Sequence, residues 1–134
     1  MNKTLRKLAV GGAAAVSAGT LLMGAAGPAA AWARDGNLEN HEFGLFYRTG
    51  NVGCVFDLAG EDRNFGDDTF RSGCDGAGAS VNDNTESYWN RDAYRWKVGT
   101  DKNLGGNVGT LPAGYWGDAS STFKNEISSA TFIL

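Results

Sequence analysis

A short polar pattern occurs twice in this sequence. The first copy is the stretch Asn82–Trp89, and a shorter version, Asn125–Ser129, lies near the C-terminus and leads toward Phe132. Each copy places a polar pair two residues before a serine: Asp83-Asn84 before Ser87, and Asn125-Glu126 before Ser129. A pattern that recurs within one small domain predicts two similar halves of one fold.

The first 33 residues have the pattern of a secretory signal peptide. Three basic residues precede an apolar run from Leu8 to Ala26, and alanines at small-x-small spacing follow. We expect cleavage after Ala31 or Ala33, and a secreted, extracellular protein. The alternative is a membrane anchor, which is disfavoured because glycine and alanine dominate the run and lower its transfer energy relative to leucine.

The remaining residues suffice for one domain and are too few for two independent cores. Removal of the three N-terminal basic residues leaves 9 basic against 15 acidic residues, a net charge of −6. A chain this acidic is repelled by phosphate backbones and anionic lipid surfaces. We therefore expect no nucleic-acid partner and no membrane association after signal cleavage.

The chain has two cysteines, Cys54 and Cys74, and both lie beyond the signal peptide. Exported proteins meet oxidising conditions in which thiols pair. We therefore expect one disulfide. The loop it closes corresponds to roughly 3 kcal/mol in the chain-entropy model.

Short aromatic or β-branched segments alternate with glycine-rich turns after residue 42. The segments that favour strands are Phe43–Tyr47, Cys54–Leu58, Tyr94–Val98 and Ile127–Leu134. No segment sustains a helical period over three turns, so the sequence predicts an all-β fold. Residues 34–42 form a polar, weakly ordered lead-in to it, and we expect most aromatic side chains, including Tyr115 and Trp116, to pack in the core.

The two halves can be matched in two ways. The stretch Gly99–Gly106 mirrors Tyr47–Gly53, because an asparagine stands one apolar residue ahead of a glycine in each. The stretch also resembles Asp62–Gly66 at an offset of 39 residues. The sequence leaves both registers open, and it indicates an insertion in the first half around Glu61–Asp75.

Together these features resemble the βγ-crystallin fold: an aromatic strand, a turn of the form aromatic-x-x-x-Asn-x-Gly, and an Asn/Asp pair followed by serine, each present twice. Among exported bacterial members, the chain is most similar to the small crystallin-fold metalloproteinase inhibitors. The strongest matches are Phe46–Phe56, Val81–Arg91 and Phe123–Phe132. The resemblance implies one βγ-crystallin-like sandwich over residues 43–134, with Greek-key motifs at about 43–90 and 94–134.

That family has a calcium signature of two Asn/Asp residues, two of any type, then Ser/Thr and Ser. Asp83, Asn84 and Ser87 match the first copy, but Tyr88 takes the last place. Oxygen donors of this kind bind calcium in extracellular modules at about 10⁻⁴ to 10⁻³ M. The second copy offers a similarly imperfect set, with Ala130 in the last place: Asn125, Glu126 and Ser129.

The structural alternative is that these side chains bind the protein itself. Asp83 and Asn125 would satisfy backbone N–H groups in Asx turns, and the two serines would tie down the hairpin of the partner motif. Calcium is thus an optional ligand in this interpretation, and no cofactor is required.

An inhibitor that mimics a substrate needs a rigid loop that enters a protease cleft. Thermolysin-like enzymes favour a large apolar residue after the scissile bond, so Cys54-Val55 beside the predicted disulfide is one candidate. The tethered loop Asp67–Gly73 is another. The structural alternative is that Val55 packs in the core from its strand and that the loop is solvated without binding a protease.

An enzyme is the main class to weigh against an inhibitor. His41 is the only histidine and lies in the polar lead-in, which leaves little for nucleophilic catalysis or a histidine zinc site. The clustered acids Asp62, Asp67, Asp68 and Asp75 are typical of a solvated acidic surface rather than an acid/base pair.

The sequence therefore predicts a secreted, monomeric, non-enzymatic inhibitor of an extracellular protease, with a metalloprotease as its target and rigid-loop insertion as its mechanism. Two alternatives stand beside it. One is a non-inhibitory crystallin-like structural or binding module with weak calcium binding. The other is an antimicrobial or toxin-like crystallin-fold protein.

Overall fold

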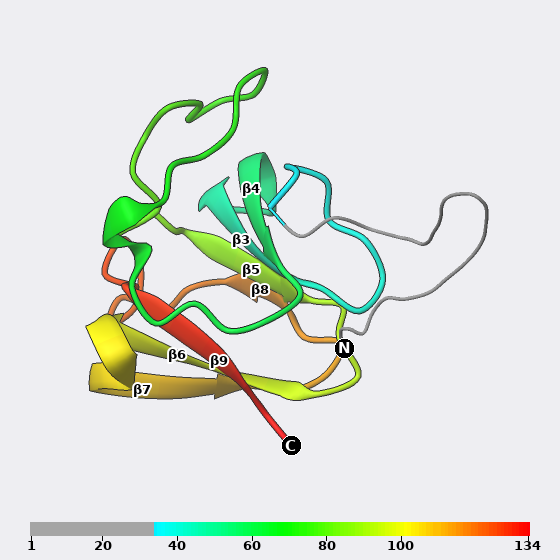
Figure 1. Ribbon diagram of the computed structural model, residues 1–134, viewed down its shortest axis with the longest axis vertical. Coiled ribbons are helices and arrows are strands. Elements are labelled where there is room, and N and C mark those ends of the chain that lie inside the picture. The colour runs from blue at the N-terminus through cyan, green and yellow to red at the C-terminus, as the bar shows by residue number, and fades with distance from the viewer. Residues whose placement is uncertain (1–33) are drawn as a thin grey trace. The chain divides into compact units, whose positions relative to one another are not determined.

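The computed structural model describes residues 34–134, in which seven strands form two antiparallel sheets and no α-helix occurs. The first sheet has the order β4-β3-β5-β8 and the second the order β7-β6-β9 (Figure 1). The strands are β3 (Phe43–Arg48), β4 (Val52–Leu58), β5 (Ser87–Asn90), β6 (Arg95–Asp101), β7 (Gly105–Leu111), β8 (Trp116–Asp118) and β9 (Ser129–Ile133). The predicted all-β class is confirmed.

Two single-turn 3-10 helices, η1 (Phe65–Asp67) and η2 (Lys102–Leu104), interrupt the connections. Neither is long or apolar enough to cross a membrane, and residues 34–134 contain no other helix. The predicted signal peptide, residues 1–33 with its cleavage sites, lies outside the described residues.

Each half of the chain contributes one segment that pairs with a strand of the other half. The first motif supplies β3, β4 and β5, and the second supplies β6, β7 and β9. β8 belongs to the second motif by sequence but pairs with β5 in the first sheet. In return, Asp62 of the first motif forms an antiparallel bridge with Ala130 of β9. This exchange joins the two Greek keys into one sandwich.

The predicted strand segments match β3, β4, β6 and β9, whereas β5, β7 and β8 were not predicted. β7 contains three glycines, which have low strand propensity, and β5 lies in the polar stretch assigned to a loop. Hydrogen bonds to neighbouring strands stabilise β5 and β7 despite their low strand propensity. β7 is held along its length by β6, and β5 lies between β3 and β8.

The two hairpins correspond at an offset of 53 residues. Phe43 pairs with Leu58 in the first, as Trp96 pairs with Leu111 in the second. The turns agree, because backbone of positive φ occurs at equivalent positions: Gly50, Asn51 and Gly53, then Asn103, Leu104 and Gly106. Both sequence registers were therefore wrong. The first register was displaced by one residue, because it aligned Asn103 with Asn51. The structural equivalent of Asn103 is Gly50, and glycine and asparagine both adopt the left-handed conformation of this position.

The repeated serines hold the hairpin turns. The Ser87 hydroxyl donates to the Arg48 carbonyl at 2.6 Å and accepts from the Asn51 N–H at 3.0 Å. The Ser129 hydroxyl does the same with Asp101 and Leu104, at 2.6 and 2.9 Å. Each serine thus ties down the hairpin of its own motif, and the expectation of the partner's hairpin was wrong.

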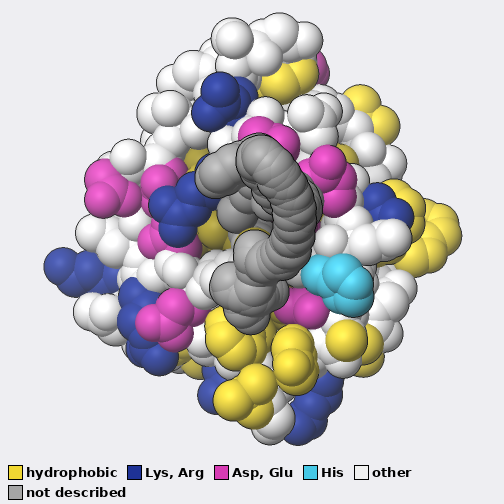
Figure 2. Space-filling model, turned by 45° about the vertical axis from the view of Figure 1, so that its right-hand side comes forward, with side chains coloured by type: hydrophobic (Ala, Val, Ile, Leu, Met, Phe, Trp, Pro, Cys, Tyr) yellow, Lys and Arg dark blue, Asp and Glu magenta, His cyan; other side chains and the backbone are white. Residues whose placement is uncertain are grey.

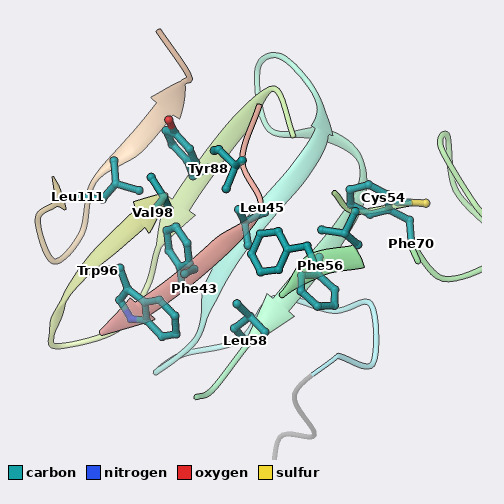
Figure 3. Close-up of a cluster of buried hydrophobic side chains, with 14 residues drawn as sticks. Phe43, Leu45, Cys54, Phe56, Leu58, Phe70, Tyr88, Trp96, Val98 and Leu111 are labelled. Carbon is teal, nitrogen blue, oxygen red and sulfur yellow. The ribbon is translucent and has the colours of Figure 1, made fainter. Parts of the chain in front are cut away.

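The core lies between the two sheets and is rich in aromatic side chains (Figure 3). Phe43 and Trp96, which are equivalent in the two motifs, stack with ring centroids 4.8 Å apart. Both are fully buried, as is Leu45. Burial of each such side chain stabilises the fold by about 1.5–3 kcal/mol.

Several aromatic side chains lie outside this core. Trp116 is 67% exposed and Tyr115 is 37% exposed, so the expectation that both pack inside was wrong. Trp116 is opposite Trp89 across β5 and β8. Side chains alternate between the faces of a strand, and the neighbouring Tyr88 is buried, so this pair points to the outer face. There β8 forms the edge of the sheet.

The lead-in is more ordered than the sequence indicated. The Asp57 carboxylate accepts the N–H groups of Asp35 and Gly36, at 3.1 and 2.8 Å. Leu38 lies over Gly44, where a Cβ would stand 2.8 Å from its Cδ2 atom. The segment is therefore fastened across the outer face of β3 and β4.

Candidate functional site

The connection between β4 and the Asp83 loop is the main departure from two-fold repetition. Residues 59–82 make it in the first motif, and the shorter segment 112–124 makes it in the second. The sequence placed the insertion around residues 61–75. The structure shows its main part as a loop that projects away from both sheets (Figure 1). We call residues 68–81 the braced loop and residues 71–78 its tip.

A short antiparallel neck closes the braced loop. Thr69 and Ser80 form a bridge, and the Phe70 N–H donates to the Ala79 carbonyl at 2.9 Å. The Gly78 N–H returns a bond of 3.0 Å to the Phe70 carbonyl. The neck separates a buried base from an exposed tip.

The braced loop is fastened to the first hairpin by an apolar contact of its base and by covalent and polar contacts within its tip. Cys74 forms the predicted disulfide with Cys54 of β4. The Phe70 ring is 2% exposed and meets Tyr47 edge to face, with centroids 5.6 Å apart. The Asp75 carbonyl accepts the Cys54 N–H at 2.9 Å. These contacts restrict the loop before it meets any partner.

Charges around the loop are mostly paired. Arg48 Nε lies 2.7 Å from the Asp75 carboxylate. Arg34 bridges Asp62 at 3.1 Å and Asp68 at 3.6 Å. Burial raises the pKa of Asp68 to about 7, and the neighbouring Asp62 carboxylate adds to the shift. On the face shown in Figure 2 acidic and basic side chains are interspersed, so this surface is not a patch of one sign.

Two shallow hollows flank the loop. One, of about 510 Å³, lies within the loop between its two arms, and Phe70, Ser72 and Ala77 line it. The other, of about 260 Å³, lies between the loop and the lead-in, and Arg34, Asp68 and Arg71 contribute to its wall. Both hollows are open to solvent rather than enclosed.

The candidate bond Cys54-Val55 lies inside β4 rather than on the loop. Cys54 is 1% exposed, and its N–H is bonded to the Asp75 carbonyl. Val55 pairs with Phe46 of β3, and its side chain lies close to Gly44 beneath Leu38. A protease reaches this peptide only after β4 loses its neighbours on both sides.

The candidate calcium residues lie where the two repeated loops meet. Asp83 and Asn125 both have left-handed backbone, with φ of 64° and 58°. The Asp83 N–H donates to Ile127 at 3.0 Å, and the Asn125 N–H donates to Thr85 at 2.8 Å. This reciprocal pairing joins the motifs and uses the backbone groups of the predicted sites.

Their side chains fit a calcium ion only in part. The Ser87 and Ser129 hydroxyls are engaged with the hairpin turns. The Asn84 amide nitrogen donates to the Ser80 carbonyl, and Glu126 is exposed. Within residues 34–134, no three histidine, cysteine or acidic side chains are grouped as metal ligands.

Two buried acids, Glu42 and Asp57, were not predicted from the sequence. Glu42 is 1% exposed, and one of its carboxylate oxygens has no hydrogen-bond partner within residues 34–134. Burial raises its pKa to about 8, and burial likewise raises the pKa of Asp57 to about 7. The strand pattern Phe56-Asp57-Leu58 placed Asp57 on the outer face. The lead-in that covers it gave no comparable signal.

The model of peptidase inhibitor family I36 matches residues 33–111, a span that includes the disulfide and the braced loop. A solved structure described as "Evolution of the eye lens beta-gamma-crystallin domain fold" is similar with a TM-score of 0.57 and 20% identity, covering 74% of this chain and 91% of that chain. No curated protein matches the sequence. These findings confirm the predicted βγ-crystallin sandwich and a protease inhibitor rather than an enzyme. The chain belongs to peptidase inhibitor family I36.

Proposed function

We propose that the protein is secreted and inhibits an extracellular metalloprotease by inserting the tip of the braced loop into the protease cleft. The observation that carries this proposal is an exposed tip that the Cys54–Cys74 disulfide tethers at Cys74, above a base that holds the buried Phe70 ring. Family membership supports inhibition of a peptidase. The metalloprotease target follows from the similarity of the sequence to bacterial metalloproteinase inhibitors.

The tip is preferred to Cys54-Val55 as the inserted segment because of backbone access. Binding at Val55 requires β4 to leave β3 and the Asp75 carbonyl, which breaks native hydrogen bonds before any contact forms. The tip needs no such step. Its base is already ordered, and each side chain that need not be immobilised on binding saves about 0.5–1.5 kcal/mol.

The first experiment measures inhibition constants of the purified, oxidised protein against thermolysin-type, subtilisin-type and trypsin-type proteases. We expect inhibition of at least one of these three enzymes. Inhibition confined to the subtilisin and trypsin types would remove the metalloprotease target. No inhibition of any of the three proteases would favour a non-inhibitory crystallin-like module.

A pair of matched variants tests the inserted segment. Ala77→Trp places a bulky side chain on the exposed tip, and Ala113→Trp places the same group on the exposed connection of the second motif. We expect the first to weaken inhibition by about tenfold or more, equivalent to about 1.4 kcal/mol, and the second to leave it unchanged. Equal effects, or none, would exclude the tip.

A further inference from the structure

The tip carries one long side chain, that of Arg71. The other tip residues are serine, cysteine, aspartate, alanine and glycines. The large apolar side chains at either end of the tip are buried, since Phe70 is 2% exposed and Val81 fully covered. A cleft that requires a large apolar side chain therefore finds none on the exposed tip.

Arg71 also brings an unpaired positive charge to this surface. The other charged tip residue, Asp75, is neutralised by Arg48 at 2.7 Å. Within residues 34–134, no carboxylate lies within salt-bridge distance of the Arg71 guanidinium, which is exposed. Its one hydrogen bond goes to the Arg34 carbonyl at 3.2 Å, a contact that is readily exchanged for a stronger ionic one.

The backbone at Arg71 is held by the loop, whereas its side chain lies against the lead-in at Gly36 and forms no salt bridge within residues 34–134. The Arg71 carbonyl oxygen lies 3.3 Å from Cys54 Sγ and 3.4 Å from Cys74 Sγ. Disulfide sulfurs have no proton to donate, so these are packing contacts. The preceding residue, Phe70, is fixed by both of its backbone hydrogen bonds to the other arm of the neck. The peptide between Arg71 and Ser72 is thus the first one beyond the neck, with its carbonyl against the disulfide.

We propose that Arg71 is the specificity-determining residue of the inhibitor, and that its target protease has an acidic primary pocket that accepts an arginine side chain. The Arg71–Ser72 peptide is then the bond presented to the catalytic centre. This inference rests on the proposed insertion of the tip. It concerns the pocket that accepts the residue before the presented bond, whereas thermolysin-like enzymes select the residue after it.

The position of the disulfide suits a bond that is attacked but not lost. Cys54 precedes the Arg71–Ser72 bond and Cys74 follows it, so the bridge spans this bond. If the bond is hydrolysed, the water oxygen joins the Arg71 carbonyl carbon and a proton goes to the Ser72 nitrogen. The two pieces stay joined through the disulfide and the sheets. The product therefore remains in the cleft, as slow release requires.

The test uses the full chain in its oxidised form and two probe enzymes. One is a trypsin-type protease, whose pocket ends in an aspartate, and the other is a thermolysin-type protease with an apolar pocket. We expect the Arg71→Ala variant to lose about 30-fold or more in inhibition of the arginine-accepting enzyme, the loss typical of a truncated hot-spot residue. Arg71→Lys should stay within about tenfold of the parent, because it keeps the charge.

Arg95→Ala is the matched control. Arg95 is an exposed arginine on β6, on the other sheet, and forms no salt bridge within residues 34–134. We expect no change in inhibition. An unchanged unfolding midpoint for Arg71→Ala would show that the lost inhibition comes from the contact and not from the fold.

The outcomes separate the two proposals. Inhibition of the thermolysin-type enzyme alone, unaffected by Arg71→Ala, would overturn the assignment of Arg71 and leave tip insertion standing. Inhibition of neither enzyme would overturn both. Mass spectrometry of the complex gives a second readout, because cleavage between Arg71 and Ser72 adds one water and yields two pieces only after reduction. Cleavage at another bond would exclude this one.

Discussion

In the first motif residues 59–82 carry a disulfide and a projecting loop, whereas in the second motif residues 112–124 make the corresponding connection without either. The hairpins that precede these two segments match each other residue for residue, and an equivalent serine holds each turn. The repeated positions therefore build the sandwich. The positions that break the repeat build the surface offered to a partner.

A second asymmetry lies beneath the lead-in. Glu42 and Asp57 are buried acids of the first motif, and the offset of 53 residues places Arg95 and Thr110 at the corresponding sites of the second. Within residues 34–134 only the first motif has a segment fastened over its outer face, through the Asp57 carboxylate. The first motif thus has two additions to the common frame, and each can be removed separately.

The largest expected effect comes from the shared frame. Phe43→Ala and Trp96→Ala each remove a fully buried ring of the central stack, and each should lower the free energy of unfolding by about 3–5 kcal/mol. Urea unfolding measures both. Trp116→Ala is the control, because this ring is largely exposed and its loss should stay within about 0.5 kcal/mol. If one core variant unfolds the protein and the other is nearly neutral, the motifs do not share the core equally.

The next effect concerns the first addition. Replacement of both Cys54 and Cys74 by serine should lower the free energy of unfolding by about 3 kcal/mol, as expected for a bridge with a sequence separation of 20. Native-state hydrogen exchange locates the change. Protection should fall at the N–H groups of Phe70 and Gly78, while the β6–β7 hydrogen bonds keep theirs relative to global stability. Uniform loss in both motifs would show that the loop is not an independent addition.

The third effect concerns the buried acids. Burial raises the pKa of Glu42 to about 8 and that of Asp57 to about 7, whereas these groups titrate near 4 in an unfolded chain. The unfolded chain releases these protons first, so their contribution is fully present below about pH 4 and is lost as the pH rises through 7 and 8. We expect the free energy of unfolding to fall by several kcal/mol between pH 5 and pH 8.

Glu42→Gln should flatten that slope, because glutamine resembles the protonated acid and does not titrate. Glu126→Gln, an exposed side chain of the second motif, is the matched control and should leave the slope unchanged. Chemical denaturation across the pH range measures all three proteins. A parent whose stability rises between pH 5 and pH 8 would contradict the burial of these groups.

The duplication was predictable from the sequence, because the polar pair and the serine recur with the same spacing. The two serines have equivalent hydrogen bonds in the structure. The disulfide followed from export and a single pair of cysteines. The register did not follow. Leu104 adopts φ of 57°, a conformation that leucine rarely takes and that no residue preference assigns to it. Only pairing of the flanking strands fixes that turn.

The site was predictable in position but not in detail. Comparison of the two halves indicated an insertion in the first motif, and Cys74 indicated that it is tethered. Burial of Phe70 depends on Tyr47, which is distant in sequence and presents its ring to the loop base. Glu42 stands beside polar residues and resembled a solvated acid. Its burial depends on how the lead-in folds back over the sheet.

The smallest expected effect is that of calcium, which tests whether the repeated loops do more than join the motifs. We propose binding at about 10⁻³ M, the weak end for extracellular modules, because the two serine hydroxyls are engaged with the hairpin turns. At about 10 mM calcium a site of this affinity adds about 1.4 kcal/mol. Thermal melting should show a rise of several degrees.

Asp83→Ala should remove the rise if the first copy binds, and Asn125→Ala if the second does. Each variant also loses a contact between the loops, since Asp83 accepts from Ser128 and the Asn125 amide donates to Glu86. The comparison is therefore the calcium-induced shift within each variant, not its absolute midpoint. Magnesium at the same concentration controls for ionic strength. An unchanged midpoint for the parent would assign both copies to architecture alone, with the reciprocal bonds of Asp83 and Asn125 as their role.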